Sequence, residues 1–267
     1  MNTASTLAGR PGTQRAQVAG TQVAAVTFEG VLERALDAAR DTSDDRFRVH
    51  FCTTHTLVEA ADDPTLRALL EAPDAIAAPD GMPLVWALRR RGGSVERVCG
   101  PDFLPALADR GRAIGARHFF YGGEPGVAES LAASLVERYP GMIVAGVWCP
   151  PFRRLTPEED QAEMDRINAV RPHFVWVALG SPKQDHWVAE HRDGLNAAVL
   201  FAVGAAFNFH VGRIRRAPGW MQRTGTEWLF RLASEPRRLA RRYAVANSRF
   251  VLLVAREWRS GRSRRRR

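Results

Sequence analysis

The sequence of 267 residues is almost without lysine: 37 of its 38 basic residues are arginines, and the exception is Lys183. It has only three cysteines, Cys52, Cys99 and Cys149, which lie far apart and form no CxxC or Cys–His spacing. This number and spacing exclude a disulfide scaffold and argue against a structural zinc site. We therefore expect reduced thiols, as in a cytosolic protein, and neither a metal site nor a resident cofactor.

Long hydrophobic runs are also missing. The longest apolar run in the basic C-terminal part, residues 250–255, has six residues, whereas a transmembrane helix needs ~18. The first 25 residues contain no apolar stretch long enough for a signal peptide. We expect a cytoplasmic protein that does not cross a membrane. A P-loop and a Gly-x-Ser-x-Gly motif are absent too, which argues against P-loop NTPases and serine hydrolases.

Positive charge is concentrated at the C-terminal end. Residues 213–267 contain 17 arginines and three acids, Glu227, Glu235 and Glu257, so they carry a net charge of +14. Residues 1–212 carry a net charge of −5. This asymmetry indicates an anionic partner. Three kinds of partner agree with it: nucleic acid, an anionic membrane and a phosphorylated substrate. A genome rich in G and C would explain the shortage of lysine, but it would not explain the segregation of charge.

Short apolar runs alternate with amphipathic stretches along most of the chain. The apolar runs predict strands at residues 47–53, 75–78, 118–121, 143–148, 174–179 and 198–203. Amphipathic spacing predicts helices at residues 28–40, 57–70, 82–91, 127–138 and 158–170. Strands that alternate with helices of this length predict an α/β fold with a doubly wound, mostly parallel sheet.

Ligands of such a sheet bind beyond the carboxyl ends of its strands. Small, polar or turn-forming residues follow five of the predicted strands: Thr53-Thr54-His55, Pro79-Asp80-Gly81, Gly122-Gly123-Glu124, Gly180-Ser181-Pro182-Lys183-Gln184 and Gly204-Ala205-Ala206-Phe207. We expect these segments to form one binding crevice at this edge of the sheet.

Two of these segments allow two interpretations each. Asp80 is a carboxylate at a strand end, where a general base would reach a bound hydroxyl group, but Asp is equally suited to cap the following helix. Gly122-Gly123 precedes a helix whose N-terminal amides would suit a phosphate. The same two glycines would also serve in an ordinary strand–turn–helix connection.

The densest polar cluster is residues 180–187. Its Gly-Ser-Pro turn would free backbone amides, Lys183 offers a point charge for a phosphate, and Gln184 can donate to and accept from a sugar or a base. The alternative is a structural loop in which Ser181 caps a helix and Trp187 is buried. Because this cluster holds the only lysine of the chain, we favour a ligand-binding role.

The basic end has helical periodicity as well. Apolar residues recur at spacings of four and three along one stripe: Leu239, Tyr243, Ala246, Phe250 and Leu253. Arginines lie off this stripe, and Trp228 and Trp258 supply aromatic side chains typical of a membrane surface. A helix on an anionic membrane and a terminal helix packed on the body agree equally with this pattern. Nucleic acid ranks third, because the arginines and aromatics match no known binding module.

Taken in order, these motifs resemble those of the WecG/TagA/CpsF family of bacterial glycosyltransferases, glycosyltransferase family 26. The resemblance spans roughly residues 47–243 and is carried by Ala78-Pro79-Asp80-Gly81-Met82-Pro83, Glu96-Arg97-Val98-Cys99-Gly100-Pro101-Asp102, Phe120-Tyr121-Gly122-Gly123, Val177-Ala178-Leu179-Gly180-Ser181-Pro182-Lys183-Gln184-Asp185, Val203-Gly204-Ala205-Ala206-Phe207 and Arg216-Ala217-Pro218. It implies a Rossmann-like fold and an inverting, metal-independent transfer of a sugar, an N-acetylhexosamine or related hexose, from a UDP-sugar. The implied acceptor is a polyprenyl-diphosphate-linked saccharide for a cell-surface polysaccharide.

By this resemblance, Asp80 is the candidate general base. Together with the strand-end segments, the resemblance predicts substrate-binding roles for Thr53, His55, Arg97, Gly122, Gly123, Gly180, Lys183, Gln184, Arg213, Arg216, Arg231, Arg238 and Arg241. In the family, the C-terminal arginines are thought to meet the lipid diphosphate. The family's Thr-x-Asn motif is here Thr53-Thr54-His55, with a bulkier residue that can become charged. The sugar that the family transfers therefore does not simply carry over.

These observations predict four parts: a disordered leader (1–24), an α/β catalytic domain (25–212), a basic helical appendage for membrane and diphosphate (213–259) and a disordered arginine-rich tail (260–267). The expected partners are the UDP-sugar, the polyprenyl-diphosphate-linked acceptor and the anionic inner face of the cell membrane, bound peripherally. No nucleic acid is expected, and a homo-oligomer remains open. The alternatives are a membrane- or nucleic-acid-binding module and an NAD-dependent oxidoreductase, although no GxGxxG turn is present.

Overall fold

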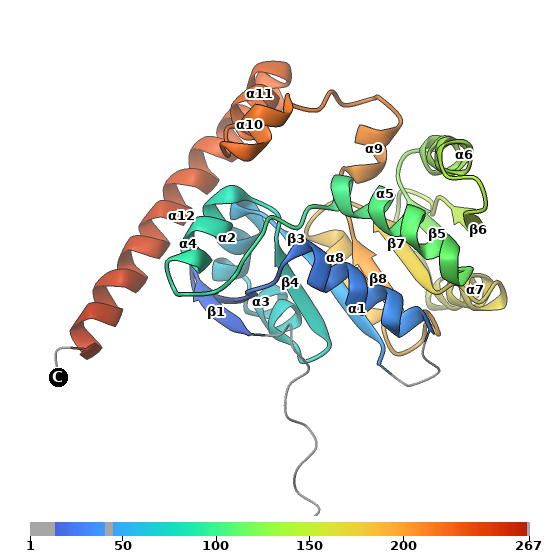
Figure 1. The fold of residues 1–267 in the computed structure, drawn as a ribbon, viewed down its shortest axis with the longest axis horizontal. Coiled ribbons are helices and arrows are strands. Elements are labelled where there is room, and N and C mark those ends of the chain that lie inside the picture. Colours follow the sequence, from blue (N-terminus) through green and yellow to red (C-terminus); the bar gives the residue numbers. More distant parts are fainter. Residues whose placement is uncertain (1–13, 41–44, 266–267) are drawn as a thin grey trace, which may run out of the picture.

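A computed structural model describes residues 14–40 and 45–265 of the chain, apart from the side chains of residues 238, 241, 242 and 260–265. Six strands form one sheet in the order β4-β3-β8-β7-β5-β6, and every pairing in it is parallel (Figure 1). The strands are β3 (Phe47–Cys52), β4 (Ala75–Pro79), β5 (Arg117–Gly122), β6 (Ile143–Trp148), β7 (Phe174–Ala178) and β8 (Val199–Ala202). The Rossmann-like, doubly wound sheet is therefore confirmed.

The central strands are apolar on both faces because helices cover both faces of the sheet (Figure 1). On one face, Trp176 and Phe201 stack with 4.2 Å between ring centroids and pack beneath α1, α5 and α6. On the other face, Val175 and Val177 pack beneath α7 and α8. The helices of the body are α1 (Phe28–Arg40), α2 (Thr54–Asp62), α3 (Pro64–Glu71), α4 (Met82–Arg89), α5 (Gly100–Gly111), the 3-10 helix η1 (Arg112–Ile114), α6 (Val127–Arg138), α7 (Pro157–Ala169), α8 (Lys183–Glu190) and α9 (Ala206–His210).

The helix predicted at residues 57–70 is in fact two helices, α2 and α3, which meet at Asp63-Pro64. Proline lacks a backbone N–H, and its ring disfavours a helical conformation of the residue before it. The Asp63 carboxylate caps α3 by accepting hydrogen bonds from the backbone N–H of Thr65 (2.9 Å) and Leu66 (3.1 Å). Asp63 therefore ends α2 and begins α3.

The predicted disordered leader is wrong for residues 15–24. Strands β1 (Arg15–Val18) and β2 (Thr21–Ala24) form an antiparallel hairpin. Val18 and Val23 are fully buried in the cluster formed with α2, α3 and α4. The Arg15 guanidinium also donates a hydrogen bond of 2.8 Å to the backbone of the α3–β4 connection. Residues 1–13 lie outside the described residues.

Three further helices follow α9, and the last is long. They are α10 (Gly219–Arg223), α11 (Glu227–Ser234) and α12 (Pro236–Arg265), and α12 runs about 45 Å along one side of the molecule (Figure 1). The predicted apolar stripe faces the body, since Leu239, Ala246 and Phe250 are buried. Arg249 binds the Asp62 carboxylate of α2 at 2.5 and 2.6 Å.

The C-terminal helix is also longer than expected. A disordered tail was predicted from residue 260, but α12 continues to Arg265, so this prediction is wrong up to that residue. Residues 266–267 lie outside the described residues. The packed stripe confirms the interpretation of a terminal helix on the body, and it leaves the opposite face of α12 available to other partners.

Candidate functional site

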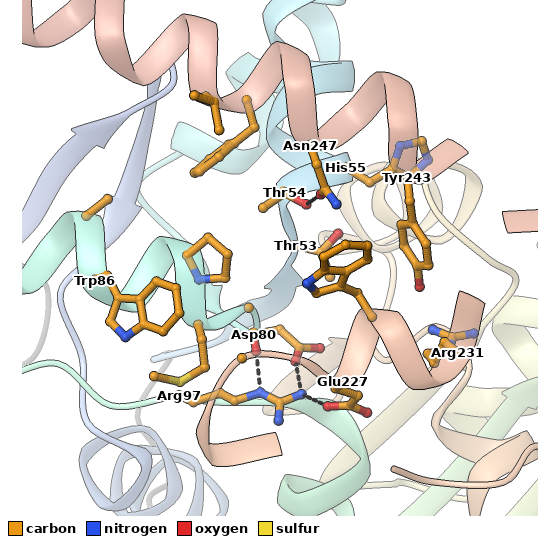
Figure 2. Close-up of a pocket in the computed structure, with 18 of the residues that line it drawn as sticks. Thr53, Thr54, His55, Asp80, Trp86, Arg97, Glu227, Arg231, Tyr243 and Asn247 are labelled. Atoms are coloured by element: carbon orange, nitrogen blue, oxygen red, sulfur yellow. Dashed lines mark hydrogen bonds and ion pairs between the residues drawn. The ribbon is translucent and has the colours of Figure 1, made fainter. Parts of the chain in front are cut away.

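Two cavities lie at the carboxyl edge of the sheet. The glycine-loop cavity has a volume of about 860 Å³ and lies among the connections that follow β5, β6, β7 and β8. The helix-lined cavity has a volume of about 590 Å³ and lies between α2 and α4 of the body and α11 and α12 (Figure 2). Residues that line both cavities are Thr53, Asp80, Pro101, Phe209 and Arg231. Asp80 therefore lies where the two cavities meet.

The sheet sets the position of Asp80, because its backbone N–H donates to Cys52 of the neighbouring strand (2.9 Å). The N-cap of α4 is Gly81, and no side chain caps this helix. The Asp80 carboxylate instead accepts a hydrogen bond from Arg97 Nη2 (3.2 Å), and Arg97 Nε donates to the Asp80 backbone oxygen (Figure 2). The helix-capping interpretation of Asp80 is thus wrong. Its side chain keeps 19% of its surface exposed, so a ligand can reach it.

The electrostatic environment makes Asp80 more basic than an ordinary aspartate. Its pKa is raised from 3.8 to about 6, because burial and, to a smaller extent, the charge of Glu227 raise it more than the Arg97 guanidinium lowers it. Burial opposes the charge on Arg97, but Asp80, Cys99 and Glu227 raise the pKa of Arg97 overall, so this residue stays a cation. A carboxylate with a pKa near 6 is ionised at neutral pH and accepts a proton more readily than an ordinary one.

Helix α2 brings the first predicted motif to the cavities. Thr53 Oγ1 accepts from the Thr56 backbone N–H and caps this helix, and Thr53 lines both cavities. His55 lines the helix-lined cavity, and its Nε2 lies 3.2 Å from the carboxylate of Glu59. Thr54 Oγ1 donates to Asn247 Oδ1 of α12 (3.3 Å), so the motif also contacts the C-terminal helix.

The two glycines after β5 serve different purposes. Both have positive φ angles, 96° at Gly122 and 82° at Gly123. A Cβ atom on Gly122 would lie 2.8 Å from the Ala178 backbone oxygen of β7, so the close approach of two strands requires glycine there. Gly122 lines neither cavity, whereas Gly123 lines the glycine-loop cavity. Of the pair, the structure brings Gly123 to the site.

The loop after β7 contributes Gly180, Lys183 and Gln184 to the glycine-loop cavity. Gln184 is buried, and its Oε1 accepts from the backbone N–H of Gly180 (3.1 Å) and of Gly204 (2.9 Å). The Lys183 ammonium lies 5.9 Å from the ring centroid of Phe152, a fully exposed side chain that also lines this cavity. Lys183 therefore places a positive charge at this cavity, while Gln184 joins two loops.

A buried network supports the same loop. Ser181 Oγ donates to the Asp185 carboxylate (2.9 Å), and His50 Nδ1 lies 2.8 Å from the other oxygen of that carboxylate. The N-cap of α8 is Pro182, so Ser181 does not cap this helix. Trp187 is buried, as the structural alternative for this loop predicted. Residues 180–187 thus form part of the cavity wall and also fix the loop to the body of the protein.

The C-terminal arginines occupy different places. Arg231 lines both cavities and lies 5.3 Å from the ring centroid of Phe209. Arg213 binds Glu124 and Arg216 binds Asp102, and neither arginine lines one of the two cavities. Arg238 and Arg241 lie on α12, but their side chains are outside the described part of the chain. Of the predicted arginines whose side chains are described, Arg97 contacts Asp80 and Arg231 lines both cavities.

The site also holds residues to which the sequence assigned no role. Glu227 accepts a hydrogen bond from Arg97 Nη2 (2.8 Å), and Tyr243, Asn247 and Trp86 line the helix-lined cavity (Figure 2). A signal for Glu227 exists, because it is one of three acids in a strongly basic segment. No such signal exists for Trp86 on α4, since its role depends on where α12 crosses that helix.

Large apolar side chains are exposed around α10–α12 and the neighbouring α4. They are Trp86, Trp220, Trp228, Leu229, Val245, Val251, Leu252 and Trp258. Over residues 14–40 and 45–265, no helix is both long enough and apolar enough to span a membrane. In the same part of the chain, no three His, Cys, Asp or Glu side chains gather in a way that would hold a metal ion.

The extent of this architecture agrees with one known protein family. The family described as the glycosyl transferase WecG/TagA/CpsF family matches residues 16–264. The match begins in the β1–β2 hairpin, includes the whole sheet and both cavities, and ends within α12. It therefore covers both the body and the C-terminal helices. With the α/β sheet, the strand-end motifs and this match over nearly its whole length, the chain belongs to the WecG/TagA/CpsF family of glycosyltransferases.

Proposed function

We propose that this protein transfers a sugar from a UDP-sugar to a polyprenyl-diphosphate-linked saccharide, with inversion and without a metal ion, at the inner face of the cell membrane. The observation that carries the proposal is the position of Asp80 at the junction of the two cavities. A reaction between two substrates needs a base at the point where they meet, and Asp80 is a reachable carboxylate with a pKa of about 6.

The glycine-loop cavity suits the donor. Its volume of about 860 Å³ is that of a typical small-molecule site. Gly123, Gly126 and Gly180 let the backbone come close to a ligand, and Lys183 supplies a cation for the diphosphate. This cavity also lies at the carboxyl edge of a parallel sheet, where nucleotides bind in folds of this type. We assign the UDP-sugar to it.

The helix-lined cavity suits the acceptor. Arg90, Arg97 and Arg231 bring positive charge for a lipid-linked diphosphate, and arginine binds phosphate oxygens in a planar, two-pronged geometry. Apolar side chains of α4 and α12, among them Trp86 and Val254, line the rest of the cavity. His55 lies at the position where the family has asparagine, so we expect it to influence which saccharide is accepted.

The reaction follows from this arrangement. The acceptor hydroxyl oxygen would attack the anomeric carbon from the face opposite UDP and form the new glycosidic bond. The bond between this carbon and the diphosphate oxygen would break, and UDP would leave with the bonding electrons. The hydroxyl proton would pass to the Asp80 carboxylate. Lys183, Arg231 and the backbone amides of the glycine loops would stabilise the charge that develops on UDP.

The C-terminal helices would bind the membrane surface peripherally. Basic side chains attract anionic lipid head groups, and the exposed Val245, Leu252 and Trp258 of α12 would enter the interface. This places the helix-lined cavity next to the membrane that holds the acceptor. In this position a lipid-linked saccharide would reach Asp80 without leaving the bilayer surface.

The direct test incubates the full chain with a panel of UDP-sugars and a polyprenyl-diphosphate-linked acceptor on anionic vesicles, and measures the product mass. One added hexose or N-acetylhexosamine per acceptor supports the proposal. A parallel titration with UDP, NAD and DNA separates the alternatives. Binding of NAD or DNA without binding of UDP would contradict a UDP-sugar transferase.

A further inference from the structure

Glu227 is the first residue of α11 and lies directly beside the Asp80–Arg97 pair (Figure 2). Arg97 Nη2 donates to Asp80 Oδ1 (3.2 Å) and also to Glu227 Oε2 (2.8 Å). Two carboxylates that line the helix-lined cavity therefore share one guanidinium nitrogen. One belongs to the sheet edge and the other to the C-terminal helices, 147 residues further along the chain.

Helix α12 has contacts with the body that do not involve Glu227. Leu239, Ala246 and Phe250 are buried against the body. Arg249 binds Asp62, and the Ala19 backbone N–H donates to Glu257 (3.0 Å). The C-terminal helix thus has its own anchors along its length. The ion pair at the start of α11 is thus free to serve a purpose other than holding α12 in place.

The charges around Asp80 indicate that this purpose concerns the basicity of the Asp80 carboxylate. An undivided Arg97–Asp80 pair would favour the ionised carboxylate and make it a poor proton acceptor. Glu227 neutralises part of the positive charge of Arg97. Its own negative charge also disfavours the ionised form of Asp80. Other charged or titratable groups also face Asp80. Asp102 of α5, which is bound to Arg216, and the thiols of Cys52 and Cys99 lie near it. Around the helix-lined cavity, the further groups are His55, Arg90, Arg231 and Tyr243.

We propose that Glu227 is a positioning residue for the transfer reaction, which acts through Arg97 to keep the Asp80 carboxylate oriented and basic. This inference rests on the proposed role of Asp80 as the base. It gives α11 a function in the chemistry, in addition to forming the wall of the acceptor cavity. The docked C-terminal helices would thereby complete the base as well as the binding site.

The test titrates Asp80 directly in the full-length protein. Aspartate labelled with ¹³C at the side-chain carboxyl gives one signal per residue, and the signal missing from Asp80→Asn identifies Asp80. The wild-type signal should titrate with a midpoint near 6. In Glu227→Gln, which keeps a hydrogen-bond acceptor and removes the charge, the midpoint should fall by ~1 pH unit. In Glu227→Ala, the midpoint of Asp80 should fall by at least the same amount.

The matched control is Glu33→Gln on α1, which breaks a surface ion pair with Arg110 of α5 and should leave the midpoint unchanged. Hydrogen exchange of α12 should stay slow in Glu227→Gln, because the other anchors remain. An unchanged midpoint in both Glu227 variants would overturn the inference. Release of α12 would also overturn it, since Glu227 would then be a latch rather than a positioning residue.

Kinetics provide a second readout. In Glu227→Gln, the acid limb of the pH–rate profile should move to lower pH together with the titration midpoint. Because the base is weaker, kcat should fall roughly threefold. The KM for the UDP-sugar should not change, since Glu227 does not line the glycine-loop cavity. The titration needs no turnover, so absence of sugar transfer by the wild type would contradict the proposed function alone.

Discussion

The side-chain oxygen of Gln184 lies 2.9 Å from the backbone nitrogen of Gly204 and accepts its hydrogen bond. The same oxygen accepts from Gly180, so one buried carboxamide joins the loops that follow β7 and β8. Both loops line the glycine-loop cavity. The loop that holds Lys183 is therefore positioned by a neighbouring strand as well as by its own turn.

This contact predicts a selective effect on donor binding. Gln184→Met keeps the volume but removes the acceptor, so the KM for the UDP-sugar should rise about tenfold, the equivalent of one hydrogen bond of ~1.4 kcal/mol. Gln184→Glu keeps an acceptor oxygen and should stay closer to the wild type. Steady-state kinetics with varied donor measures both. If Gln184→Glu is as impaired as Gln184→Met, the carboxamide NH₂ contacts the substrate and the role in loop positioning is wrong.

Replacement of Asp80 should separate chemistry from binding. Asp80→Asn removes the proton acceptor and keeps the shape, so kcat should fall by roughly 10²- to 10⁴-fold. The Kd of UDP, measured by calorimetry, should change by less than about twofold, because most of the glycine-loop cavity is untouched. In the wild type, activity should decline below a pH of about 6 as Asp80 becomes protonated. Full activity of Asp80→Asn would remove Asp80 as the base.

The same variant should be more stable than the wild type, with a defined pH dependence. The pKa of Asp80 is raised from 3.8 to about 6 in the folded protein, so its ionisation opposes folding. Linkage gives a penalty of about 3 kcal/mol at most, which is absent below pH 3.8, develops up to pH 6 and stays constant above it.

Asp80→Asn should therefore unfold with a free energy about 1–3 kcal/mol higher at pH 7.5 and show almost no difference at pH 4. Chemical denaturation at the two pH values measures this. An Asn variant that is less stable at pH 7.5 would mean that the Arg97 contact outweighs the burial of the charge.

Exposed apolar residues on α12 predict how the protein meets a membrane. Val245 and Leu252 keep 49% and 58% of their surface exposed and line neither cavity. Leu252→Glu should weaken sedimentation with anionic vesicles about tenfold or more, because a buried leucine contributes ~1.5–3 kcal/mol. Val245→Glu should act in the same direction.

The matched control is Val136→Glu on α6, where a valine is 42% exposed on a helix outside the C-terminal segment. This variant should bind vesicles as the wild type does. Equal losses in Val136→Glu and Leu252→Glu would mean that added negative charge, and not the α12 face, determines the binding.

Much of the fold could be predicted from the sequence because its signals are local. All six predicted strands occur, and helices α1 and α6 have the predicted bounds. Apolar runs bounded by glycine, proline or aspartate form strands that are buried on both faces, and amphipathic stretches must cover them. The edge that carries the site was also predictable, since the carboxyl ends of parallel strands share one edge.

Two errors have physical causes. The hairpin at residues 15–24 has strands of four residues each, too short for alternation to be recognised, and it is stabilised by burial of Val18 and Val23 under distant helices. The end of α2 was overlooked although Pro64 marks it. In the first case the stabilising contacts are tertiary, and in the second the local rule was present in the sequence.

By itself, the sequence determined the class of fold, the edge of the sheet and the identity of the residues that follow each strand, because these depend on short-range periodicity. Only the tertiary structure decided that α12 turns its apolar stripe inward and that Glu227 shares Arg97 with Asp80. These contacts join segments more than 100 residues apart, and their geometry depends on how helices pack, which no local pattern encodes.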